Sequence, residues 1–204
     1  DMETLKAENE SLKQKNSELE QSLRELEIIQ SENETLKEYV NLKEKYNNYE
    51  SIPSYVINKE ISNFGSTIII NVGKKDGVEP NMTVISDKGL VGYIISTTNT
   101  TAKVQTIIDT ATAVSATIST SRDSILVRGT LDANYTLKAT YIPTDAKLLQ
   151  GDIIETSGIG GIYPKGIKIG TIKEIINTKN ITDRYAIIET AVDFSKLETV
   201  LVIK

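Results

Sequence analysis

The chain has 204 residues, contains no Cys, Trp or His, and carries a formal net charge of −5. Without Cys and His there is no disulfide framework, no thiolate or imidazole metal site and no Ser-His-Asp triad, so most hydrolase classes are excluded. The acidic balance argues against nucleic acid as a main partner, because phosphate binding draws on clustered Lys and Arg. No run of eighteen apolar residues occurs, and we expect no cofactor and no metal.

Residues 2–49 predict one long helix, since they contain no Gly and no Pro. Leucine recurs every seven residues from Leu5 to Leu26, which is typical of a left-handed coiled coil. Asn residues at two a positions favour a parallel dimer with a fixed register, at a cost in stability. We therefore expect residues 1–50 to form the coiled-coil arm of a homodimer; the alternative is a lone amphipathic helix folded onto the globular part. The predicted dimerisation seam consists of Leu5, Asn9, Leu12, Asn16, Leu19, Leu23 and Leu26.

The heptad phase shifts after Leu26, where Ile29 follows at a step of three residues instead of four. Such a stammer locally overwinds a coiled coil. The chain also opens at Asp1 inside the helical pattern, so we expect further chain upstream of it.

Everything after Pro53 is predicted to be β-structure. Apolar, β-branched runs of five to nine residues alternate with Gly, Asp, Asn and Pro turns, and about twelve short strands result. The predicted fold class is therefore mainly β with an N-terminal helical coiled coil, and with two small antiparallel six-stranded barrels or sandwiches. We place the first β-domain at 51–120 and the second at 121–204. The sequence leaves open whether one barrel is inserted in the other.

Residues 151–170, GDIIETSGIGGIYPKGIKIG, hold six glycines and one proline between two apolar segments. Glycine at this density predicts backbone with φ > 0 or close backbone approach, and hence one elaborate loop. Ser157 lacks a histidine base, so we interpret it as part of a structural turn. Lys165 precedes Gly166 and a predicted strand, whereas a phosphate-binding P-loop leads into a helix.

The same loop carries apolar side chains on a backbone that Pro164 stiffens. A shaped apolar loop predicts an anchor for another protein; the alternative is that these side chains plug the end of their own barrel. An exposed sheet edge elsewhere is a further candidate surface. The candidate partner-binding residues are Ile159, Ile162, Tyr163 and Ile167.

Three landmarks follow the helical arm in a fixed order. The first, residues 68–94, has Gly73, Gly77, Gly89 and Gly92 around an apolar strand and a G-L-V-G turn. The third is the closing VDFSKLETVLVI of residues 192–203. The second landmark, between these two, comprises Gly151, Asp152, Thr156, Ser157, Gly158, Gly160, Gly161, Pro164, Gly166 and Gly170. In this order the three landmarks resemble the rod shape-determining protein MreC family, which usually has Phe where this chain has Tyr163 before the loop proline.

The resemblance implies a non-catalytic scaffold of the bacterial cell-wall elongation machinery that controls rod shape. Such proteins are single-pass proteins of the cell membrane with the β-region on the extracytoplasmic side. They form homodimers or filaments, bind a class B penicillin-binding protein (the elongation transpeptidase) and MreD, and engage actin-like MreB indirectly.

Two alternatives belong to other functional classes. A periplasmic adaptor of an export system also joins a coiled coil to small β-domains, but usually through a helical hairpin with β-sequence on both sides. A wall-processing enzyme is opposed by the missing His and by the lack of a close carboxylate pair in the glycine-rich loop.

Overall fold

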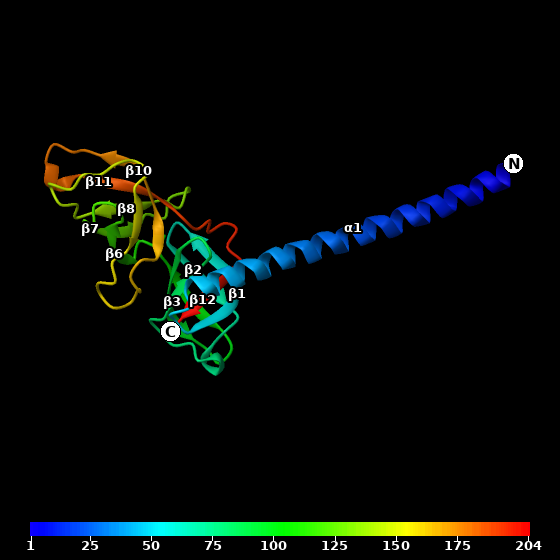
Figure 1. The fold of residues 1–204 in the computed structure, drawn as a ribbon, viewed down its shortest axis with the longest axis horizontal. Coiled ribbons are helices and arrows are strands. Elements are labelled where there is room, and N and C mark those ends of the chain that lie inside the picture. The colour runs from blue at the N-terminus through cyan, green and yellow to red at the C-terminus, as the bar shows by residue number, and fades with distance from the viewer. The chain divides into compact units, whose positions relative to one another are not determined.

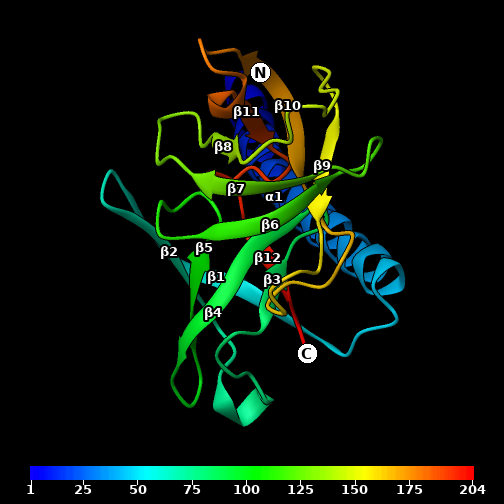
Figure 2. The same ribbon diagram turned by 90° about the vertical axis from the view of Figure 1, so that its left-hand side faces the viewer.

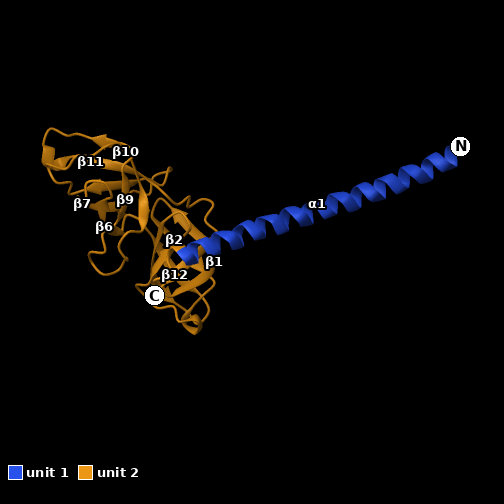
Figure 3. Cartoon of the chain, viewed as in Figure 1, with its two compact units in different colours: residues 1–44 blue, residues 45–204 orange.

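The computed structural model describes residues 1–204, which divide into two compact units, Asp1–Glu44 and Lys45–Lys204 (Figure 3). The first unit is helical: α1 (Met2–Lys45) is a single helix of 44 residues. At 1.5 Å per residue it is about 66 Å long. No helix of the structure combines the length and the apolar character that a membrane span requires.

The second unit contains two closed antiparallel barrels of six strands each (Figure 1), which confirms the predicted fold class. The first barrel has the strand order β1-β12-β3-β4-β5-β2, and the second has the order β10-β11-β8-β7-β6-β9. The strands of the first barrel are β1 (Ser51–Ser62), β2 (Gly65–Ile70), β3 (Thr83–Ile85), β4 (Leu90–Thr97), β5 (Ala102–Thr106) and β12 (Thr199–Ile203). Those of the second are β6 (Ala113–Ile118), β7 (Ser124–Gly129), β8 (Leu137–Thr140), β9 (Ile153–Thr156), β10 (Lys168–Ile176) and β11 (Tyr185–Thr190).

The second barrel is inserted into the first. The chain leaves the first barrel after β5, forms β6 to β11, and returns through β12, which pairs with β1 at Ser51↔Ile203. The continuous division into 51–120 and 121–204 therefore differs from the structure, because β6 lies in the second barrel and β12 in the first. The physical reason is that β12 closes the first barrel by pairing with both β1 and β3, a non-local contact with no signal in the sequence around residue 120.

Each barrel buries one face of its strands. Along β2 and β5 buried and partly exposed residues alternate, as the two-residue period of a strand requires. Bulges interrupt the register in β1, β4 and β10, and bulges help strands bend into a closed barrel. At Gly92 of β4 a Cβ would overlap the Gln105 carbonyl oxygen of β5, so only glycine allows this approach of two strands.

Asp109 fixes the connection between the barrels. Its carboxylate is buried and accepts hydrogen bonds from the backbone amides of Ser66 and Ala111, both at 2.7 Å. The Ser66 amide belongs to β2 of the first barrel, and Ala111 immediately precedes the second barrel. One carboxylate therefore holds the start of the inserted barrel against the first.

Candidate partner-binding groove

The loop of residues 157–167, called the glycine loop below, joins β9 to β10 and is tied at its base by Thr156. The Thr156 hydroxyl donates to the Pro164 carbonyl and accepts from the Ile167 amide at 2.9 Å. The backbone carbonyl of Thr156 accepts from Gly166 at 2.9 Å. These hydrogen bonds hold the two ends of the loop together, with Thr156 at one end and the segment Pro164–Ile167 at the other.

The glycine loop docks on the first barrel. The Thr83 hydroxyl of β3 donates to the Ile162 carbonyl at 2.7 Å. The ring of Tyr163 meets that of Tyr93 on β4 edge to face, with centroids 6.2 Å apart and an interplanar angle of 81°. Figure 2 shows the loop, yellow to orange, extending from the second barrel toward β3. These two contacts join the barrels through one loop of the inserted domain.

The Tyr163 side chain is 8% exposed, and its hydroxyl has no hydrogen-bond partner. Burial raises the pKa of the Tyr163 phenol, and the nearby Tyr93 raises it further. The phenol therefore stays neutral at physiological pH. An unpaired buried hydroxyl is unfavourable, so the ring rather than the hydroxyl accounts for the stabilising part of this contact.

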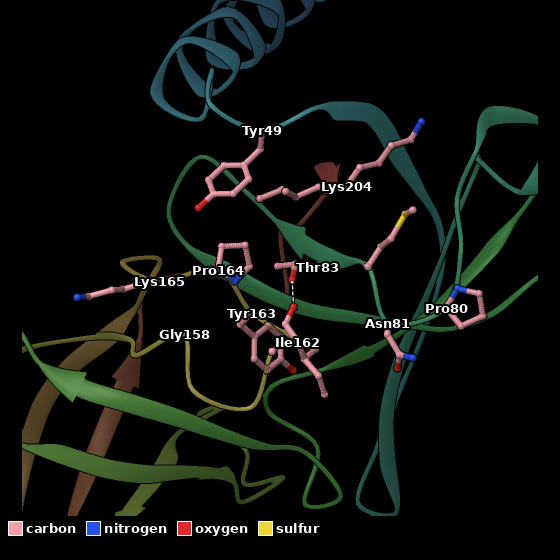
Figure 4. A pocket seen from close by; sticks show the side chains of 13 residues that line it. Tyr49, Pro80, Asn81, Thr83, Gly158, Ile162, Tyr163, Pro164, Lys165 and Lys204 are labelled. Carbon is pink, nitrogen blue, oxygen red and sulfur yellow. Dashed lines mark hydrogen bonds between the residues drawn. The ribbon is translucent and has the colours of Figure 1, made fainter.

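A groove of about 570 Å³ lies where the glycine loop meets the first barrel (Figure 4). Both barrels contribute to it, together with Tyr49 from the segment that precedes β1. Its apolar walls include Pro80, Met82, Ile162 and Pro164, and the lysines are Lys165 and Lys204.

The four predicted partner-binding residues separate into two pairs. Ile159 and Ile162 are 66% and 41% exposed, whereas Ile167 is 1% exposed and Tyr163 is also buried. Ile167 therefore offers no free surface, and Tyr163 lines the groove but is mostly covered, as the alternative of buried loop side chains expects. Ile159 and Ile162 keep the exposure that the anchor hypothesis requires. The Tyr163 ring also packs against Tyr93 of the first barrel, a contact that neither hypothesis includes.

The glycines of the first two landmarks fall into two groups by geometry. Where φ is positive, an L-residue would be strained; where φ is ordinary, a Cβ would meet backbone of a neighbouring segment. The first group is Gly77, Gly151, Gly158, Gly160, Gly161 and Gly166, and the second is Gly73, Gly89, Gly92 and Gly170.

The polar residues of the second landmark bind backbone groups. The Ser157 hydroxyl donates to the Ser115 carbonyl at 3.0 Å and accepts from the Ile159 amide at 3.2 Å. The Asp152 carboxylate accepts from the Leu149 amide at 2.9 Å. Asp152 therefore fixes the turn before β9, and Ser157 fixes the start of the glycine loop.

The apolar residues of the predicted seam on α1 are all exposed within the single chain. Their exposed fractions run from 57% at Leu23 to 67% at Leu19. Nothing in the first unit covers this stripe of leucines, which lies on one face of α1 by its heptad spacing.

Sequence reasoning missed the first-barrel half of the groove. Thr83, Tyr93 and Met82 lie within the first landmark, but more than sixty residues from the glycine loop, and nothing in the sequence connects the two. Only the aromatic Tyr163, in an otherwise small-residue loop, signals that something must bury it.

The chain is similar to known proteins in sequence and in fold. The family model described as "Rod shape-determining protein MreC, barrel core" matches residues 56–204. The cell shape-determining protein MreC of Listeria monocytogenes is 30% identical over 179 residues, which are 86% of this chain. The chain spans 61% of that relative's own length.

Solved structures share the fold. An MreC structure from Listeria monocytogenes matches with a TM-score of 0.70 at 30% identity, over 93% of this chain and 95% of that one. A structure of a complex between penicillin-binding protein PBP2 and MreC from Helicobacter pylori matches with a TM-score of 0.58 at 17% identity, over 76% of this chain and 98% of that one. At that identity the likeness concerns the fold alone.

Proposed function

Because the chain belongs to the rod shape-determining MreC family, we propose that it is a non-catalytic scaffold of the cell-wall elongation machinery. In this role it binds a class B penicillin-binding protein, the elongation transpeptidase, on the extracytoplasmic side of the cell membrane. The observation that carries the proposal is the double-barrel fold, which this chain shares with the Helicobacter pylori protein described in complex with PBP2.

The same proposal assigns the two units different tasks. The helical arm brings copies of the chain together through its leucine seam, as a homodimer or a filament. The exposed fractions of Leu5, Leu12 and Leu19, all between 60% and 67%, support this task, because a seam of this kind is buried only by a second helix. Anchoring in the cell membrane, with MreD and indirectly MreB as further partners, completes the proposed assembly.

The site chemistry supports scaffolding rather than catalysis. The hydroxyls of Thr156 and Ser157 are both engaged by backbone groups of the loop and its neighbour β6. A nucleophilic serine requires an adjacent base, and the chain contains no histidine to act as one.

Direct binding tests this function. The purified chain is immobilised, and the purified extracytoplasmic part of the elongation transpeptidase from the same bacterium is passed over it in biolayer interferometry. We expect saturable binding at micromolar concentration, and none with an unrelated penicillin-binding protein at the same concentration. Absence of binding to the elongation transpeptidase contradicts the proposal.

A further inference from the structure

The groove between the glycine loop and the first barrel has the size of a ligand-binding site, since such sites span roughly 300–1,000 Å³. Ile162, Met82 and the two prolines Pro80 and Pro164 give it apolar walls. Tyr49, 38% exposed, adds an aromatic ring at one side. A side chain such as Leu or Phe from another molecule would bury apolar surface on several of these walls at once.

The charge of the groove departs from that of the chain as a whole. The chain carries a net charge of −5, yet no Asp or Glu lines the groove. Its two lysines, Lys165 and Lys204, lie on opposite sides (Figure 4). Lys204 forms an ion pair with Glu50 at 3.1 Å, whereas Lys165 has no carboxylate within 4.0 Å. An occupant with a carboxylate beside its apolar side chain therefore complements this surface.

Two other ways of binding fit less well. Both barrels are closed, so neither offers a free strand edge on which a partner could add a strand. A glycan needs many hydrogen-bonding side chains, but the Thr83 hydroxyl is already donated to Ile162, and the exposed uncharged polar side chains that remain on the groove are Asn81 and Tyr49. The walls favour insertion of protein side chains.

The groove is also held in shape before anything binds. The Thr83–Ile162 hydrogen bond and the Tyr93–Tyr163 contact fix the glycine loop against the first barrel. Preorganisation of this kind lowers the entropic cost of binding. The same contacts mean that an occupant touches both barrels and therefore depends on their relative placement.

We propose that this groove receives a short, extended segment of a partner protein in which a large apolar side chain stands next to a carboxylate. The inference rests on the proposed function, because the partner is the elongation transpeptidase. Ile162 is the apolar contact at its centre, and Lys165 attracts the carboxylate.

The test compares single substitutions in the full chain by interferometry against the purified elongation transpeptidase. Ile162→Ser is expected to weaken binding at least about fivefold, mainly through faster dissociation, which corresponds to the 1 kcal/mol commonly used to define an important contact. Lys165→Glu is expected to slow association several-fold at low salt, with a smaller difference at high salt. Ile181→Ser and Lys179→Glu are matched controls, since both residues are exposed and neither lines the groove.

Each outcome is decisive. If the wild type binds and all four variants bind equally well, the proposed role of the groove is contradicted, whereas the proposed function stands. No wild-type binding overturns both. Loss of retention on purified peptidoglycan in Ile162→Ser, with transpeptidase binding intact, assigns the groove to a glycan and also overturns the inference. If Ile162→Ser lowers the melting temperature, the exposed Lys165→Glu still provides the comparison.

Discussion

Large apolar side chains are mostly exposed on the helix and mostly buried in the barrels. Leu12 and Leu26 of α1 are 60% and 62% exposed, whereas Ile70, Ile94 and Ile188 of the barrels are fully buried. A closed barrel surrounds its own core, but a single helix with an apolar stripe has nothing within itself to cover it. The comparison teaches that the β-region folds on internal contacts, whereas the helix leaves an apolar stripe exposed that we propose a second helix covers.

The two regions also differ in the sequence separation between the residues that act together. The seam residues of α1 follow one another at steps of three and four residues. The first barrel, in contrast, closes through β1 and β12, and it meets the second through Tyr93 and Tyr163. Substitutions in the barrels should therefore change stability, and substitutions in the helix should change oligomeric state.

The largest expected effect is at Gly92. A Cβ there overlaps the Gln105 carbonyl of the neighbouring strand, so Gly92→Ala is expected to cost about 3 kcal/mol or more in the free energy of unfolding. Gly160→Ala is the matched control, because Gly160 has φ +95° but open space around its Cα and should cost about 1 kcal/mol. Thermal denaturation followed by circular dichroism measures both. Equal losses at the two positions contradict the close strand approach.

The contact between the barrels is tested at Tyr163. Tyr163→Ala removes a buried ring and is expected to cost roughly 2–4 kcal/mol, which lowers the melting temperature of the β-region by several degrees. Tyr163→Phe keeps the ring and removes a hydroxyl that has no partner, so its stability should equal or exceed that of the wild type. A marked loss in Tyr163→Phe would show that the hydroxyl is paired in solution.

A substitution in the seam sharpens the other side of the comparison. Asn16→Ile places a better-packing residue at an a position and is expected to raise the melting temperature of the helical arm while loosening its preference for dimers. Circular dichroism at 222 nm and light scattering report the two quantities. An unchanged melting temperature means that Asn16 does not lie in a helix–helix seam.

The smallest expected effect concerns the hydrogen bond between Thr83 of β3 and the glycine loop. Thr83→Val preserves the shape of a buried side chain but removes the hydrogen bond to the Ile162 carbonyl. We expect a loss of about 1 kcal/mol in unfolding free energy by urea titration. A loss close to zero would indicate that water replaces the hydroxyl at this carbonyl.

Much of this architecture can be predicted from the sequence because its signals are local. Heptad spacing predicts α1, two-residue alternation predicts the strands, and glycine density predicts the loop after β9. The glycine density of that loop predicts positive φ, and Gly158 and Gly161 have φ of +80° and +77°.

What escaped prediction depends on contacts between distant segments. The return of β12 to the first barrel follows from pairing with β1, whose partner residues lie about 150 positions away. Tyr163 is recognisable as a residue that needs burial, but its contact with Tyr93 becomes visible only in the folded chain. The groove forms only where the two barrels meet. In the sequence Asp109 resembles an ordinary turn residue, and its role follows from the hydrogen bond that it accepts from the distant Ser66 amide.

The most direct test of the contrast between the helix and the barrels is sedimentation of the full chain at micromolar concentration. Wild type is expected to sediment as a dimer. Leu12→Asp combined with Leu19→Asp places charges in the seam and should give a monomer with an unchanged β-region melting temperature. Gln14→Asp combined with Gln21→Asp adds the same charges two residues further on, away from the seam, and should remain dimeric. A monomeric wild-type chain, or a seam variant that still dimerises, would contradict the assignment of association to the helix.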